Sequence, residues 1–182
     1  MEFIPEGSMW MFYLLLFIGP FVQEDTAVIA AAGLSLTSPN PWFLIFAVVL
    51  AGLIASDSWK YWLGWAAKHH MWAKKYGERE RVQKLKGVVQ ENAIKSLVTV
   101  RFLPMARIPT YLATGFFGVP YIKYWLSITF SGFLYVSMFF LAFHLLGELV
   151  GEKLKVYLPI VAVGLVVMLL GGLFLKKRFG GK

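Results

Sequence analysis

Two arginines and two prolines interrupt an otherwise apolar stretch, in the sequence R-F-L-P-M-A-R-I-P-T that begins at Arg101. A lone arginine at membrane depth costs roughly 2.5 to 17 kcal/mol, and Pro104 and Pro109 each remove a helical N–H donor. Guanidinium groups stay charged and bind phosphate oxygens with paired hydrogen bonds. On a straight helix Arg101 and Arg107 would point about 240° apart, whereas a turn at Pro104 would bring them together.

We therefore expect Arg101 and Arg107 to hold a phosphate group. The alternative is that one or both extend to the cytoplasmic interface and anchor the segment there.

Carboxylates interrupt two other apolar stretches, at Glu24-Asp25 and at Asp57. A low dielectric favours the protonated form of such a group, which suits it to carrying protons. The same acids could instead form static ion pairs with the arginines, and Glu24-Asp25 could lie in a solvated external turn. Either Glu24 or Asp25 could be the functional acid. Asp57 either faces a polar cavity or lies near the cytoplasmic surface, with Lys60 at i+3 as a local partner.

Other kinds of chemistry have little support in the sequence. There are no cysteines and no H-E-x-x-H pattern, so we expect no metal and no cofactor. No nucleophilic serine motif is present, and no histidine accompanies the arginines. We therefore expect a protein that is not an enzyme.

The composition indicates an integral membrane protein. Apolar residues make up 58% of the 182-residue chain and the mean hydropathy is +0.64, whereas soluble domains have about 45–50% apolar residues. Of the eighteen basic residues, seven lie between Lys68 and Lys86 and four lie at the C-terminus. This clustering is typical of cytoplasmic loops and argues against nucleic-acid binding. We place residues 68–92 and the C-terminus in the cytoplasm and the protein in the cell (inner) membrane.

The apolar pattern predicts an all-α membrane domain over residues 9–182, after a flexible or expression-derived leader of residues 1–8. An interrupted stretch, 9–36, divides into pieces 9–22 and 26–36, with Pro20 beside the break. A second interrupted stretch, 93–119, contains Pro104, Pro109 and Gly115. Full spans are expected at 42–66, 120–147 and 156–175, and a basic interfacial helix at 71–92. Five glycines should allow segments to approach closely: Gly33, Gly52, Gly64, Gly115 and Gly118.

The distribution of lysine and arginine indicates that residues 93–119 enter and leave the membrane on the cytoplasmic side. It indicates that residues 9–36 enter and leave on the outside. The chain then contains two oppositely oriented units, each a re-entrant hairpin followed by a span, with 156–175 added. Such inverted repeats with broken helices are typical of transporters. The alternative is that 9–36 crosses the bilayer with a kink at Gly19-Pro20.

Three stretches over roughly residues 19–147 resemble the DedA family of VTT-domain membrane proteins. They are Glu24-Asp25-Thr26 with the following alanine-rich run, Ser56-Asp57 followed by Tyr61 and Gly64, and Arg101-Phe102-Leu103-Pro104 followed by Arg107. The resemblance implies facing re-entrant hairpins and transfer of phosphate-bearing lipids between leaflets, with acidic residues linked to the proton-motive force. It also implies functional roles for Glu24, Asp57, Arg101 and Arg107.

The sequence thus predicts a flippase or scramblase for phosphate-headed lipids such as undecaprenyl phosphate or phosphatidylethanolamine, with proton coupling through Glu24, Asp25 or Asp57. The alternative is a proton-coupled small-ion transporter without a lipid substrate. The expected partners are membrane lipids and protons, and a homo-oligomer is compatible with the sequence.

Overall fold

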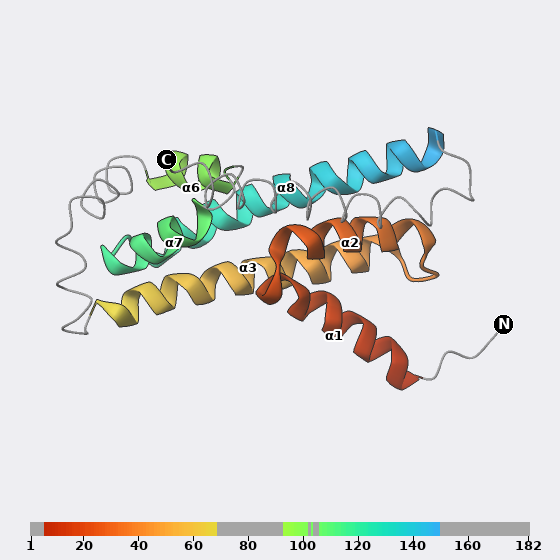
Figure 1. Ribbon diagram of the computed structural model, residues 1–182, viewed down its shortest axis with the longest axis horizontal. Helices are drawn as coiled ribbons and strands as arrows, with labels where there is room; N and C mark the ends of the chain where they lie inside the picture. The colour runs from red at the N-terminus through yellow and green to blue at the C-terminus, as the bar shows by residue number, and fades with distance from the viewer. Residues whose placement is uncertain (1–5, 69–92, 102, 104–105, 150–182) are drawn as a thin grey trace, which may run out of the picture. The chain divides into compact units, whose positions relative to one another are not determined.

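The computed structural model describes residues 6–68, 93–101, 103 and 106–149 (Figure 1). Within these residues the chain is helical throughout, without a strand, which confirms the expected all-α class. The helices are α1 (Glu6–Val22), α2 (Glu24–Thr37), α3 (Trp42–Ala67), α6 (Ala93–Arg101), α7 (Arg107–Phe116) and α8 (Tyr121–Leu149).

Helices α3 and α8 are long and apolar enough to cross a membrane, over Trp42–Ala67 and Tyr121–Gly147. They coincide with the spans expected at 42–66 and 120–147. Large apolar side chains such as Ile122, Phe130 and Leu141 are exposed along α8. Exposure on this scale is unfavourable in water but suits a lipid environment, so these two helices support integration into a membrane.

The described helices belong to two compact units, and the first comprises Met1–Gly52 together with Val136–Lys182. In this unit α1 and α2 pack against each other, and a Cβ on Gly19 would lie 3.1 Å from the Cβ of Ala27. The break between them is at Gln23, which has an extended backbone with φ −153° and ψ 107°. The expected interruption near residues 19–25 is therefore present, and Pro20 lies inside α1, two residues before the helix ends.

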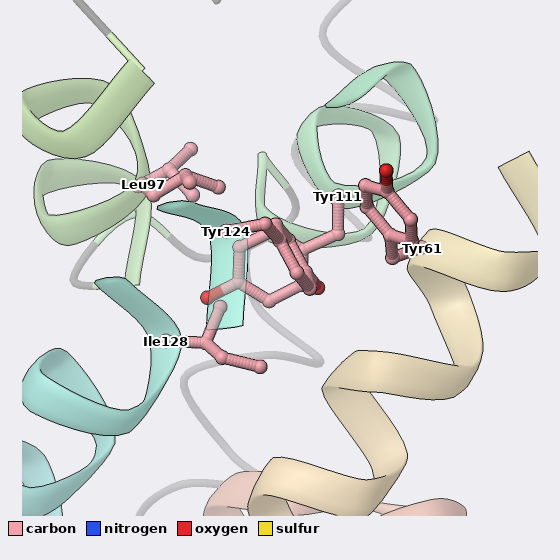
Figure 2. Packing of buried hydrophobic residues seen from close by; sticks show 6 residues of the cluster. Tyr61, Leu97, Tyr111, Tyr124 and Ile128 are labelled. Carbon is pink, nitrogen blue, oxygen red and sulfur yellow. The ribbon is translucent and has the colours of Figure 1, made fainter. Parts of the chain in front are cut away.

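The second unit, Leu53–Tyr135, contains the end of α3, α6, α7 and the first half of α8. Its core is a cluster of buried side chains from all four helices, shown in Figure 2: Tyr61, Leu97, Val100, Tyr111, Tyr124 and Ile128. The rings of Tyr61 and Tyr124 lie 4.8 Å apart, and Tyr111 meets Tyr124 edge to face at 5.7 Å. This aromatic core fixes the four helices that carry the arginines and Asp57.

Two glycines bring the backbones of α3 and α7 together inside the second unit. A Cβ on Gly64 would collide with the carbonyl oxygen of Leu112, and one on Gly115 would collide with that of Tyr61. Only glycine permits this approach at both positions, so the expectation of close contact at Gly64 and Gly115 is confirmed. In the first unit Gly52 likewise faces the backbone of Phe17.

Helix α7 ends in a Schellman motif. The Val119 N–H donates to the backbone carbonyl of Thr114, and the Gly118 N–H donates to the backbone carbonyl of Gly115. Gly118 adopts φ +71°, the left-handed conformation that this motif requires. The Tyr61 hydroxyl donates to the Val119 carbonyl at 2.6 Å. Together these bonds hold the connection from α7 to α8 against α3.

Some predicted features lie outside the described residues: the interfacial helix 71–92, the span 156–175 and the turn at Pro104. The re-entrant, inverted-repeat arrangement stays a prediction. Among the described helices, α1 packs against α2 and α6 packs against α7.

Candidate functional site

Arg101 is the last residue of α6 and is only 1% exposed. Its Nη2 donates to Asp57 Oδ2 at 2.5 Å, and its Nε donates to the hydroxyl of Ser131 at 3.1 Å. The Ile128 carbonyl lies 3.4 Å from Nη2. Arg101 thus joins α6 to α3 through an ion pair and to α8 through a hydroxyl, and its charge is kept inside the unit.

Arg107 is the first residue of α7 and is also buried, at 9% exposed. Its Nη2 donates to the backbone carbonyl of Arg101 at 2.8 Å. Carbonyls at a helix C-terminus lack helical partners and carry partial negative charge, so Arg107 caps α6. This bond ties the two ends of the helix break to each other.

One aromatic ring lies beside both guanidinium groups. The Cζ of Arg107 is 5.5 Å from the centre of the Tyr135 ring, and the Cζ of Arg101 is 6.0 Å from it. Both distances fall in the range of cation–π attraction. The structure therefore brings together two arginines that a continuous helix would have separated.

Asp57 is fully buried and contacts two cations through its two carboxylate oxygens. Oδ2 accepts from Arg101, and Oδ1 lies 3.2 Å from Lys60 Nζ. Lys60 also donates to Ser56. The Tyr124 hydroxyl donates to the Asp57 backbone carbonyl at 2.7 Å, which fixes this turn of α3 against α8. Asp57 therefore has both the arginine and the local lysine as partners.

Glu24 and Asp25 occupy the first turn of α2, where both side chains are half-buried. Carboxylates are favoured at this end because unpaired N–H groups give it partial positive charge. The two acids belong to the first compact unit, whereas the arginines belong to the second. Their pairing with the arginines and their role in proton coupling stay predictions.

The remaining expected residues take ordinary helical positions. Pro109 is the third residue of α7, where a proline is tolerated because first-turn N–H groups have no helical acceptor. Gly115 lies one residue before the end of α7, at the close contact with α3. These two residues shape α7 and its packing. Within the part of the chain described, no three His, Asp or Glu side chains cluster so as to hold a metal ion.

Sequence reasoning missed several residues of the site. Tyr124, Ile128, Ser131 and Tyr135 follow one another at i, i+4, i+7 and i+11 and so share one face of α8. Ser131 and Tyr135 contact the arginines, and Tyr124 contacts Asp57. A signal for these residues was present in the sequence. Their spacing places them on one face of the helix, and three of the four carry a hydroxyl group in an otherwise apolar span, which indicates a face that packs against polar groups.

The chain matches the VTT domain over residues 19–145. No curated protein and no solved structure matches it. The match covers α2, α3, α6 and α7 completely and includes all the acids and arginines discussed above. The chain therefore belongs to the VTT-domain family, the DedA family of membrane transporters.

Proposed function

We propose that this protein moves phosphate-headed lipids between the leaflets of the cell membrane, with Arg101 and Arg107 binding the phosphate. The observation that supports this most directly is the convergence of two buried guanidinium groups beside the Tyr135 ring. Paired guanidinium groups match the geometry and charge of a phosphate. A single structural ion pair would require only one of them.

Asp57 has a role in this proposal as the partner of Arg101 when no lipid is bound. A phosphate entering the site would compete with the carboxylate for the guanidinium, and protonation of the carboxylate would favour the exchange. Lys60 contacts the other carboxylate oxygen, so Asp57 would keep one cation when Arg101 turns to the phosphate. Glu24 or Asp25 would supply a further proton-coupled step.

The substrate class is a lipid whose phosphate carries negative charge, such as undecaprenyl phosphate or phosphatidylethanolamine. The exposed apolar faces of α3 and α8 suit contact with lipid tails. Transfer of the headgroup past the arginines would then leave the tails in the bilayer.

The test is headgroup transfer in vesicles reconstituted with the purified protein, measured with acyl-labelled fluorescent phosphatidylethanolamine and with fluorescent polyprenyl phosphate. Wild type, Arg101→Gln and Arg107→Gln are compared with and without a pH gradient. Lys123→Gln is the matched control, because Lys123 is an exposed cation of the same unit. We expect each arginine variant to lose at least about tenfold in rate, as for the loss of a charge-assisted hydrogen bond, and the control to transport normally.

The outcomes separate the alternatives. Arginine-dependent transfer that responds to the gradient supports a proton-coupled carrier, and transfer that ignores the gradient supports a scramblase. Normal transfer by folded Arg101→Gln and Arg107→Gln would rule out the phosphate-binding role. If wild type moves neither lipid, the proposal fails, and a proton-coupled small-ion transporter becomes the better description.

A further inference from the structure

Among the described residues of the second unit, three buried donor groups have no hydrogen-bond partner: Nη1 of Arg101, the hydroxyl of Tyr111 and the hydroxyl of Thr129. The first two are considered together, because Tyr111 interacts electrostatically with Arg101. Arg101 is 1% exposed and Tyr111 is 0% exposed, so solvent cannot satisfy either group in this structure. Buried polar side chains are normally hydrogen-bonded, and exceptions often mark a functional site. These two donors call for an acceptor that the described residues do not provide.

The other buried tyrosines of the same cluster show that its hydroxyls can be satisfied. Tyr61 donates to the Val119 carbonyl at 2.6 Å and Tyr124 donates to the Asp57 carbonyl at 2.7 Å. Figure 2 shows these three rings packed in one core. The Tyr111 hydroxyl is therefore an exception among chemically identical neighbours, although its ring packs as well as theirs.

The two unsatisfied donors lie in the same neighbourhood. The Tyr111 hydroxyl interacts electrostatically with Asp57, Arg101 and Arg107, and it approaches the Arg101 side chain most directly, but the two groups do not meet in a hydrogen bond of normal geometry. Tyr111 also follows Arg107 by four residues, so both project from the same face of α7. An oxygen with several lone pairs, placed between these groups, could accept from both donors.

We propose that Nη1 of Arg101 and the hydroxyl of Tyr111 form a two-donor subsite for one phosphoryl oxygen of the ligand. This inference rests on the proposed function and adds Tyr111 to the binding residues. Arg101 contacts Asp57 through Nη2 and Ser131 through Nε, so Nη1 can receive the phosphate before the ion pair opens. Because both groups are buried here, the subsite fills only when the helices around it open, as a transport cycle requires.

A subsite made of two donors selects for an oxygen that only accepts. A phosphoryl oxygen meets this requirement, whereas an ammonium group offers only donors. The subsite therefore recognises the phosphate itself and is indifferent to the group attached beyond it. A phosphomonoester lipid and free inorganic phosphate share this chemistry, and the experiment distinguishes them.

Tyr111→Phe is the direct test, with Tyr61→Phe as the matched control. Both changes remove one buried hydroxyl from the same cluster and keep the ring. Detergent-solubilised full-length protein is titrated with dioleoyl phosphatidic acid, with dioleoylglycerol, which has the same tails but no phosphate, and with inorganic phosphate. The thermal unfolding midpoint of each variant is measured in parallel.

The two variants should behave in opposite ways. We expect Tyr111→Phe to weaken binding of phosphatidic acid by about tenfold, the effect of one hydrogen bond to a charged acceptor. Its unfolding midpoint should be unchanged or raised, because the hydroxyl makes no hydrogen bond of normal geometry in the folded protein. Tyr61→Phe should bind as wild type does and unfold at a lower temperature, since it loses an existing hydrogen bond.

Two results would overturn the subsite. One is wild-type binding of phosphatidic acid by folded Tyr111→Phe while Arg107→Gln loses it, which would leave the proposed function standing. The other is a lowered midpoint with unchanged binding, which would mean that Tyr111 has a structural partner such as buried water. If wild type itself does not prefer phosphatidic acid to dioleoylglycerol, the proposed function fails as well. Binding of inorganic phosphate at similar strength would assign the subsite to free phosphate rather than a lipid headgroup.

Discussion

At the scale of single residues, Asp57 is the centre of the charged cluster. It is fully buried and neutralises Arg101 on one oxygen while contacting Lys60 on the other. A buried ion pair adds little net stability over an apolar pair, but removing one member leaves an uncompensated charge. The Arg101–Asp57 pair should therefore show strong coupling between its two members.

We expect Asp57→Asn to lower the free energy of unfolding by about 3 kcal/mol, because Arg101 would keep a buried charge without its carboxylate. The double variant Asp57→Asn/Arg101→Met should regain much of this loss. Lys60→Met, which removes the more exposed partner, should cost less. Reversible unfolding in detergent micelles measures all three, and equal stability of Asp57→Asn and wild type would contradict the coupling.

At the scale of helices, the contact between α3 and α7 depends on glycine. The backbones touch at Gly64 and Gly115, and no side-chain rearrangement can relieve a collision with a carbonyl oxygen. The same two helices carry residues of the site: Asp57 lies on α3, and Arg107 and Tyr111 lie on α7, with Tyr111 near enough to Asp57 for electrostatic interaction. Packing of α7 on α3 is thus a condition for assembling the charged cluster.

Gly115→Ala should therefore lower the free energy of unfolding by about 2 kcal/mol, the usual range for overpacking, and should also impair transport. Gly147→Ala is the control, because its Cβ would meet only the end of the Leu36 side chain, at 3.2 Å. That variant should be neutral or up to about 1 kcal/mol more stable, since alanine favours helices. Equal behaviour of the two variants in unfolding experiments would show that the α3–α7 contact is not tight.

At the scale of the whole molecule, the expected topology follows from where the basic residues lie. They concentrate between Lys68 and Lys86 and at the C-terminus, whereas the connection between α2 and α3 is uncharged. From the positive-inside rule we expect the basic segments in the cytoplasm and this connection outside. On that expectation helix α3 would cross the bilayer from outside to inside.

The chain has no cysteine, so the reaction of a single introduced cysteine with a thiol reagent shows on which side of the membrane that position lies. Thr37→Cys in intact cells should react with a membrane-impermeant maleimide, because Thr37 is exposed at the end of α2. Lys86→Cys should react only after the membrane is permeabilised, and the cysteine-free parent should not react. Labelling of both variants from the same side would refute the topology.

Much of the fold was predictable from the sequence because the governing effects are local. Helices α3 and α8 follow from runs of apolar residues of membrane length, and the break between α1 and α2 follows from polar Gln23 and the acids after it. The arginine–proline stretch marked the break between α6 and α7. The acids and arginines stood out as candidates because charge in an apolar stretch requires compensation.

Only the tertiary structure decided which groups meet. Asp57 and Arg101 are 44 residues apart in sequence, and their contact depends on how α3 and α6 are rotated about their axes. The contact of Tyr135 with both guanidinium groups and the unsatisfied hydroxyl of Tyr111 also follow from the packing of four helices. A residue's type and its local period determine which face of its own helix it occupies. Which side chain it meets is decided by interhelical packing, and that depends on all the facing surfaces together.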